Sequence, residues 1–155
     1  MRLALFQPDI AQNLGAAIRL CACLAVCLDI IEPCAFPLDD RSLKRAALDY
    51  GPLARMTRHD SWDQFVLAAG SHRLILMTTK AASPLYDFRF RPDDVLLMGS
   101  ESAGAPPHVH AAVAARLRIP IDPAARSLNL VTAATLALGE ALRQTCGFPS
   151  PSACP

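Results

Sequence analysis

The sequence has little that would mark a membrane-bound, exported or strongly charged protein. No apolar run approaches the roughly 18 residues that a membrane-spanning helix needs. The first nine residues lack a long apolar stretch with a small-residue cleavage site, so they do not look like an export signal. The formal net charge is only +1, which by itself gives no argument for nucleic acid. We expect a soluble cytoplasmic protein that does not bind membranes.

Two common phosphate-binding motifs and a disulfide framework are also missing. The sequence contains neither the Gly-x-Gly-x-x-Gly spacing of dinucleotide sites nor the Gly-Lys-Ser/Thr ending of a P-loop. Without an export signal, the six cysteines are not expected to form disulfides. Cys21, Cys23 and Cys27 fall in an apolar helical stretch, where residues two apart point in different directions. His108 and His110 have no third ligand nearby, so no metal site is predicted.

Short apolar runs alternate with helical patterns along the chain, which is typical of an α/β fold with a largely parallel sheet. Asp60 is the predicted N-cap of the third helix. We expect one domain over residues 1–148 and a loose, proline-rich tail over residues 149–155. The predicted strands are 2–6, 28–31, 73–78, 95–98 and 117–121, and the predicted helices are about 13–25, 39–48, 61–69, 107–115 and 128–145.

The first of three polar stretches, residues 13–19, follows the first predicted strand. Asn13 lies at the expected N-cap, Gly15 removes a side chain from the first turn, and Arg19 follows one turn later on the same face. A helix N-terminus with an arginine one turn away suits a phosphate group. A capped amphipathic helix with an exposed arginine explains the pattern as well.

The second stretch, residues 97–106, runs from a strand straight into a loop. Gly99 and Gly104 permit close approach of the backbone to a ligand. Glu101 places a carboxylate at the edge of the sheet, where it could bind an amine or hold the loop. Pro107 suits a helix start. A plain strand-to-helix turn is the alternative interpretation.

The third stretch, residues 119–130, is a proline-braced loop that ends at the last helix, with Ser127 as the expected N-cap. Its short, stiff backbone suits a ligand cradle, and an ordinary connector is the alternative. In open parallel sheets, ligands bind beyond the carboxyl ends of the strands. All three stretches follow such ends, so they are the candidate binding residues.

The order of the three motifs resembles a known family. Asn-x-Gly-x-x-x-Arg, Gly-x-Glu-x-x-Gly-x-Pro and Ser-Leu-Asn are similar to the three motifs of the SpoU-like branch of the SPOUT methyltransferases. Leu48-Asp49-Tyr50 and Thr57-Arg58-His59 further resemble the small TrmL-type enzymes that act on the wobble nucleotide of tRNA. The resemblance covers residues 1 to about 148.

The resemblance implies a fold and an assembly that the apolar pattern does not predict. The expected fold is a parallel-sheet SPOUT fold with a C-terminal trefoil knot, although knots are rare in proteins. The expected assembly is a homodimer in which the first motif of one subunit faces the cofactor of the other. Leu130, Leu136 and Leu138 would help to form its interface. The implied cofactor is S-adenosyl-L-methionine, held by Met77, Thr78, Gly99, Glu101, Ile119, Ser127 and Leu128.

The implied reaction transfers a methyl group to a ribose 2′-oxygen of tRNA. Arg19 and Asn13 are the catalytic candidates, with Arg19 acting as a base or holding a substrate phosphate. Lys80, Arg126 and Arg143 are candidates for contacts with tRNA phosphates. The expected substrate is the wobble cytidine or uridine of leucine tRNAs.

Three alternatives remain open at this point. The enzyme could methylate another tRNA or rRNA position, the chain could bind S-adenosylmethionine and RNA without catalysis, or it could be an unrelated doubly wound enzyme. The sequence departs from the family pattern at Ala103, at Val131-Thr132 and at Gly139, which often is a tyrosine. These positions lie nearer the expected substrate than the cofactor.

Overall fold

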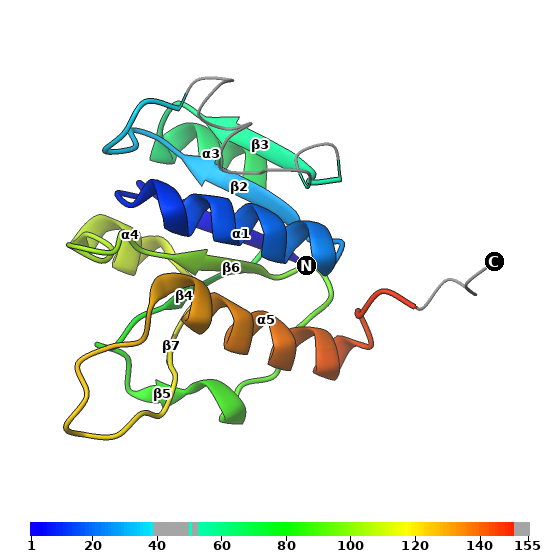
Figure 1. Cartoon of the computed structure of the whole chain (residues 1–155). Helices are drawn as coiled ribbons and strands as arrows, with labels where there is room; N and C mark the ends of the chain where they lie inside the picture. Colours follow the sequence, from blue (N-terminus) through cyan, green and yellow to red (C-terminus); the bar gives the residue numbers. More distant parts are fainter. Residues whose placement is uncertain (39–49, 51–52, 151–155) are drawn as a thin grey trace.

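A seven-stranded sheet forms the centre of the molecule (Figure 1), in a computed structural model that describes residues 1–38, 50 and 53–150. The strand order is β3-β2-β1-β6-β4-β7-β5, and each pairing between these strands is parallel. This confirms the predicted α/β fold class. The strands are β1 (Arg2–Phe6), β2 (Cys27–Ile31), β3 (Met56–His59), β4 (Leu74–Met77), β5 (Ser83–Pro84), β6 (Val95–Met98) and β7 (Ala115–Arg118).

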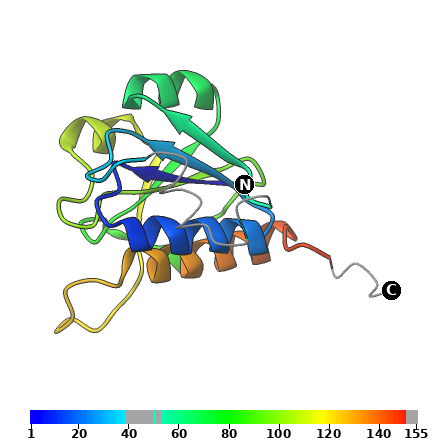
Figure 2. The ribbon, with the colours of Figure 1, turned by 45° about the horizontal axis from the view of Figure 1, so that its top comes forward.

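Helices cover both faces of the sheet, as Figure 2 shows. Helices α1 (Ala11–Cys23) and α5 (Leu130–Thr145) lie side by side on one face, while α3 (Trp62–Ala69) and α4 (Pro107–Ala112) cover the other. A short 3-10 helix, η2 (Leu85–Asp87), follows β5. Because β4 and β6 are covered on both faces, all of their residues are buried, which explains their unbroken apolar sequences.

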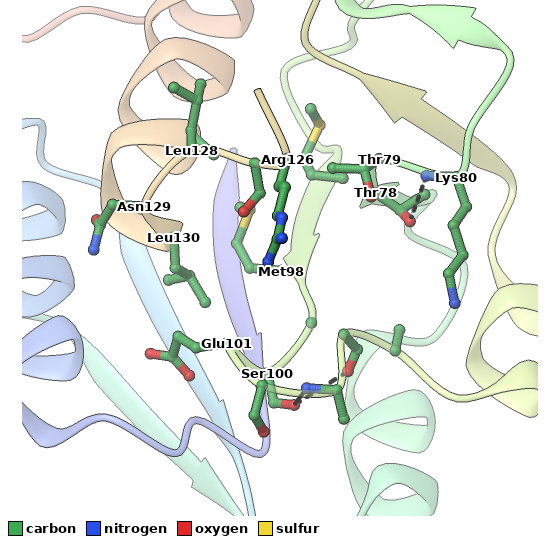
Figure 3. A pocket seen from close by; sticks show the side chains of 18 of the residues that line it. Thr78, Thr79, Lys80, Met98, Ser100, Glu101, Arg126, Leu128, Asn129 and Leu130 are labelled. Carbon is green, nitrogen blue, oxygen red and sulfur yellow. Dashed lines mark hydrogen bonds between the residues drawn. The ribbon is translucent and has the colours of Figure 1, made fainter. Parts of the chain in front are cut away.

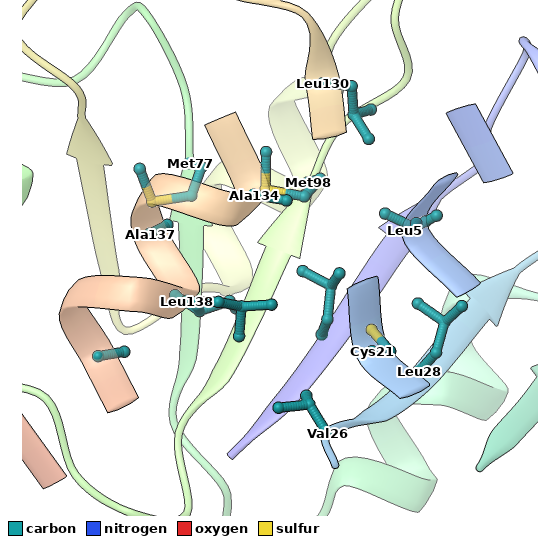
Figure 4. Close-up of a cluster of buried hydrophobic side chains, with 14 of the residues drawn as sticks. Leu5, Cys21, Val26, Leu28, Met77, Met98, Leu130, Ala134, Ala137 and Leu138 are labelled. Atoms are coloured by element: carbon teal, nitrogen blue, oxygen red, sulfur yellow. The ribbon is translucent and has the colours of Figure 1, made fainter. Parts of the chain in front are cut away.

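The larger core lies under α1 and α5 (Figure 4). Leu5 and Leu28 of the sheet belong to the same buried cluster as Cys21 of α1 and Leu138 of α5. Burial, with smaller effects of Cys27 and Asp29, raises the pKa of the Cys21 thiol to about 12, so this residue behaves as a small apolar side chain.

Packing in this core also determines which leucines of α5 could contact a second subunit. Leu138 is fully buried and Leu130 is 9% exposed, so both belong to the core of their own chain. Because Leu138 is fully buried, its predicted place in a dimer interface is wrong, whereas the predicted places of Leu130 and Leu136 stay predictions. Leu136, at 40% exposed, is the most accessible of the three leucines.

A buried ionic cluster joins β1, β2 and β3 on the face covered by α3. The Asp29 carboxylate, 1% exposed, accepts bonds of 2.9 and 2.6 Å from the Arg2 guanidinium and lies 2.8 Å from Nε2 of His59. The His59 ring in turn packs edge-on against Phe65 of α3. A buried carboxylate is tolerated only with such partners, so the cluster ties the three strands together.

The chain crosses itself where β7 lies between β4 and β5. Leu117 of β7 is paired with Met77 on one side and with Ser83 on the other. Residues 78–82 connect β4 to β5 and therefore have to cross β7. The Thr78 N–H donates to the Leu117 carbonyl over 2.8 Å at this crossing. A late strand is thus placed between two strands that come earlier in the chain.

Several predicted boundaries differ from the structure. The strand predicted at 117–121 is Ala115–Arg118, and α4 ends at Ala112 rather than near residue 115. Two strands were not predicted from the sequence: β3, an edge strand with exposed polar residues, and β5, which has only two residues. The helix predicted at 39–48 and most of the predicted tail lie outside the described residues.

Three predicted helix caps are also wrong. The N-cap of α1 is Ile10, because the helix begins at Ala11 and Asn13 lies inside its first turn. Ser61, not Asp60, caps α3 by accepting a bond from the Gln64 N–H. Asn129, not Ser127, caps α5. Of the residues that the structure describes, none belongs to a helix long and apolar enough to cross a bilayer.

Candidate functional site

A cavity of about 690 Å³ opens beyond the carboxyl ends of β4, β6 and β7 (Figure 3). This size is typical of sites for small molecules and cofactors. The three polar stretches converge here, since its lining includes residues from 98–105 and 119–130 as well as Asn13. Of the residues proposed from the sequence, those that line it are Asn13, Met77, Thr78, Lys80, Gly99, Glu101, Ile119, Arg126, Ser127 and Leu128.

The loop after β6 closes tightly upon itself. The Ser100 N–H donates to the Gly104 carbonyl over 3.1 Å, and the Gly104 N–H donates back over 2.9 Å. A Cβ atom added at Gly99 would come within 2.5 Å of the Gly104 carbonyl carbon, so a larger residue there would open the loop. Gly104 itself has φ +71°, in the left-handed region.

A chain of side-chain amides and a carboxylate connects the three stretches. Nδ2 of Asn13 donates to Oε1 of Glu101 over 2.8 Å, and Nδ2 of Asn129 donates to Oδ1 of Asn13 over 3.0 Å. The other end of the Asn129 amide caps α5 by accepting from the N–H groups of Val131 and Thr132. Asn13, 9% exposed, is thereby fixed in the first turn of α1.

Asp9 connects the segment before α1 to the same loop. Its N–H donates to Oε2 of Glu101 over 3.0 Å, and its Oδ2 accepts from the N–H and hydroxyl of Ser102. Hydrogen bonding with the Glu101 side chain, and then with Ser102, lowers the pKa of Asp9 below 3.8 against the opposing effect of burial. The buried Oδ1 of Asp9 has no hydrogen-bond partner among the described residues. These hydrogen bonds join the segment before α1 to the loop after β6.

The lining offers separate surfaces for the parts of an amphipathic ligand. Met77, Met98 and Leu130 provide apolar contacts, while the closed loop at Gly99 presents backbone groups. In Figure 3 the Arg126 side chain extends toward Met98, and Lys80 lies across the cavity from it. Such a mixture suits a flat ring joined to a charged chain.

Arg19 does not line this cavity. It is exposed on α1, and its Cζ atom lies 5.0 Å from the centroid of the Tyr50 ring. Arg19 is six residues beyond Asn13, which at about 100° per residue places the two side chains on different faces of the helix. The structure therefore brings Asn13, but not Arg19, to the cavity of the same chain.

Arg143 also lies away from the cavity. It is in the last turn of α5, whereas the cavity is at the first turn, about 20 Å away along a helix. Its Nη2 is 2.8 Å from Glu140, and its side chain is 68% exposed. Its predicted contact with tRNA stays a prediction.

Some lining residues were missed by the sequence analysis. Asn129 was part of the Ser-Leu-Asn motif, and its preference for N-cap positions could have identified it in place of Ser127. His110 of α4 also lines the cavity, although the sequence suggested it only as a metal ligand, an interpretation rejected for lack of a third ligand.

The sequence and the fold are both similar to those of known proteins. The sequence profile of the SpoU rRNA Methylase family matches residues 1–139. The chain therefore belongs to the SpoU methylase family. A tRNA (cytidine(34)-2'-O)-methyltransferase of Beijerinckia indica subsp. indica is 54% identical over 145 residues, which are 92% of this chain and 90% of that protein.

Solved structures agree with this assignment. One that concerns the 2-OH methylation of C/U34 on tRNA has a TM-score of 0.87 at 41% identity, covering 92% of this chain and 94% of its own. The SpoU methyltransferase AviRb from Streptomyces viridochromogenes, in complex with the cofactor AdoMet, has a TM-score of 0.78 at 27% identity. It covers 93% of this chain and 60% of its own.

Proposed function

We propose that this chain is a tRNA 2′-O-methyltransferase that transfers the methyl group of S-adenosylmethionine to the ribose of the wobble nucleotide 34. The observation that carries the proposal is the cavity built by the three motifs, on a chain 54% identical to a tRNA (cytidine(34)-2'-O)-methyltransferase. We further propose that the enzyme acts in the cytoplasm, where its tRNA substrate is found. The match over residues 1–139 supports one methyltransferase domain over this part of the chain.

The residues at the cavity fit S-adenosylmethionine. Apolar side chains such as Met98 and Leu130 can enclose the adenine, and the closed Gly99 loop allows its backbone to approach. The acidic side chain of Glu101, which lines the cavity, makes the site favourable for a cationic sulfonium. When bound, this cofactor supplies an activated methyl group. The role of the protein is to align a ribose oxygen with it.

The position of Arg19 supports a homodimer. Arg19 is the family arginine, yet it does not line the cavity of its own chain. A second copy, with its α1 facing this cavity, would supply the guanidinium. The 2′-hydroxyl loses its proton during the attack, and a guanidinium is a poor base. We therefore give Arg19 the role of binding an RNA phosphate and orienting the ribose, with Lys80 and Arg126 binding further phosphates at the rim.

The crossing at β7 supports the trefoil knot that the family resemblance implies. Residues 78–82 pass across β7, and the chain after β7 continues through the cavity lining to α5. In this arrangement the crossing loop, through Thr78, Thr79 and Lys80, and the loop after β7 both line the cavity. Binding of the cofactor by backbone groups would follow from the knot itself.

The first test is methyl transfer to tRNA with mapping of the product. We expect purified protein to methylate the 2′-oxygen of nucleotide 34, detected by nuclease resistance and mass spectrometry. Arg19→Ala should lower transfer about a hundredfold or more, with the Kd for S-adenosylmethionine within about twofold of wild type. Arg89→Ala, which removes another exposed arginine, is the matched control. Methylation at a different nucleotide would contradict the proposed substrate.

A complementation test examines the shared site. Gly99→Val should disrupt the cofactor loop by steric clash and, like Arg19→Ala, should be inactive alone. In a refolded mixture, heterodimers would contain one cavity with an intact loop and an arginine from the other subunit. Recovery of activity is therefore expected. A mixture that forms heterodimers but stays inactive would rule out donation of Arg19 between subunits.

A further inference from the structure

The guanidinium of Arg19 lies over the ring of Tyr50. Cζ of Arg19 lies 5.0 Å from the ring centroid, within the range of a cation–π contact. Tyr50 is half-buried, and its carbonyl accepts the N–H groups of Leu53 and Ala54 over 3.0 Å each. The backbone of Tyr50 is thus fixed by two hydrogen bonds, while the side chain of Arg19 is exposed on α1.

The kind of contact matters for what Arg19 can still bind. Arg2, Arg58 and Arg73 each direct N–H groups at a carboxylate, at Asp29, Glu32 and Asp94 respectively. A ring engages the flat face of a guanidinium and uses none of its N–H donors. Contact with Tyr50 can therefore orient Arg19 without occupying the edge that would bind a phosphate.

An exposed arginine samples many rotamers, and fixing them costs up to about 2 kcal/mol in side-chain entropy. An arginine that acts across a subunit boundary has to reach a reacting ribose with small positional error. A ring that restricts its guanidinium beforehand lowers the entropy lost when RNA binds. Tyr50 does not line the cavity, so its ring would not contact the cofactor.

We propose that Tyr50 is a positioning residue for methyl transfer, which pre-orients Arg19 through its ring face. This inference rests on the proposed function. It predicts that the aromatic ring, and not the phenolic hydroxyl, is the required group. It also predicts that Tyr50 affects the chemical step and not the affinity for the methyl donor.

The test compares two substitutions at one position. Tyr50→Phe keeps the ring face and should leave kcat within about twofold of wild type. Tyr50→Leu removes the face and should lower kcat about fivefold, the rate equivalent of one exposed cation–π contact. The Kd for S-adenosylmethionine, measured by calorimetry, should be unchanged in both. Tyr86→Leu, at the exposed second tyrosine of the sequence, is the matched control and should be as active as wild type.

Each outcome distinguishes the inference from the proposed function. If wild-type protein transfers no methyl group to tRNA, the proposed function fails first. If wild type is active and Tyr50→Leu retains full kcat, only the role of Tyr50 is overturned. If Tyr50→Phe is as impaired as Tyr50→Leu, the hydroxyl is the important group and the ring-face mechanism is wrong. A loss of cofactor affinity together with a lower unfolding temperature in Tyr50→Leu alone would indicate a structural role instead.

Discussion

The two ends of helix α5 both carry amide side chains, but they use them differently. At the first turn, Asn129 caps the helix and also donates to Asn13 in the cavity lining. Near the last turn, Gln144 clamps a neighbouring backbone segment. Its Nε2 donates to the Phe88 carbonyl over 2.9 Å, and its Oε1 accepts from the Phe90 N–H over 3.0 Å.

The difference shows how one element can serve function and stability separately. The contacts of Asn129 reach, through Asn13, to Glu101 on the loop after β6, so they set the relative positions of site residues. The contacts of Gln144 satisfy backbone groups far from the cavity. Substitutions at the first end should mainly lower catalysis, and those at the second end should mainly lower the free energy of unfolding.

The largest effect is expected at the first end. Asn129→Ala should lower methyl transfer about a hundredfold, because Asn13 and the loops lose their common partner. Loss of the cap should also lower the unfolding free energy by about 1 kcal/mol. Asn129→Ser can cap the helix but cannot donate an amide bond to Asn13, so it should regain stability without regaining activity. A fully active serine variant would contradict this role for the amide.

At the second end the effect should appear in stability. Gln144→Ala leaves the Phe88 carbonyl and the Phe90 N–H without their partner, and should lower the unfolding free energy by about 2 kcal/mol. Denaturant unfolding measures this change. Transfer by the folded variant should stay near the wild-type rate, and Gln64→Ala, at an exposed glutamine of α3, is the control. A large loss of kcat would remove the distinction between the two ends.

The smallest effect concerns Glu140, which neighbours Gln144. Hydrogen bonds from Arg143, then from Gln144, lower the pKa of Glu140 from 4.5 to about 2 in the folded protein. Between pH 2 and pH 4.5 the unfolded chain binds more protons than the folded protein. The stabilisation from ionised Glu140 is therefore present above pH 4.5 and is lost as the pH falls toward 2. The difference in unfolding free energy between wild type and Glu140→Gln should therefore be constant at neutral pH and shrink below pH 4.5. A difference independent of pH would contradict the shift.

The sequence predicted the central strands better than the edges of the sheet. The bounds of β1 and β6 agree with the predictions to the residue, because strands covered on both faces have continuous apolar sequences. The edge strand β3 and the two-residue β5 lack that signal. The insertion of β7 between β4 and β5 depends on contacts along the whole chain, and the sequence pattern did not predict it.

The site was predicted in outline but not in its internal connections. Motif order identified the loops that meet at the cavity. The bonds of Asn13 to Glu101 and Asn129 join residues 88 and 116 positions apart, so local pattern could not show them. The placement of Arg19 outside its own cavity required the structure, since spacing alone suggested a phosphate site beside Asn13.

The crossing of β7 has a consequence for how the protein is made. Ribosomal synthesis delivers the segment 78–82 well before residues 115–130 have emerged. The nascent chain can form the β1, β2 and β3 part of the sheet early. The binding cavity can form only after β7 has inserted between β4 and β5. A bound methyl donor would then hold both segments at once, and should slow the reverse passage of the strand during unfolding.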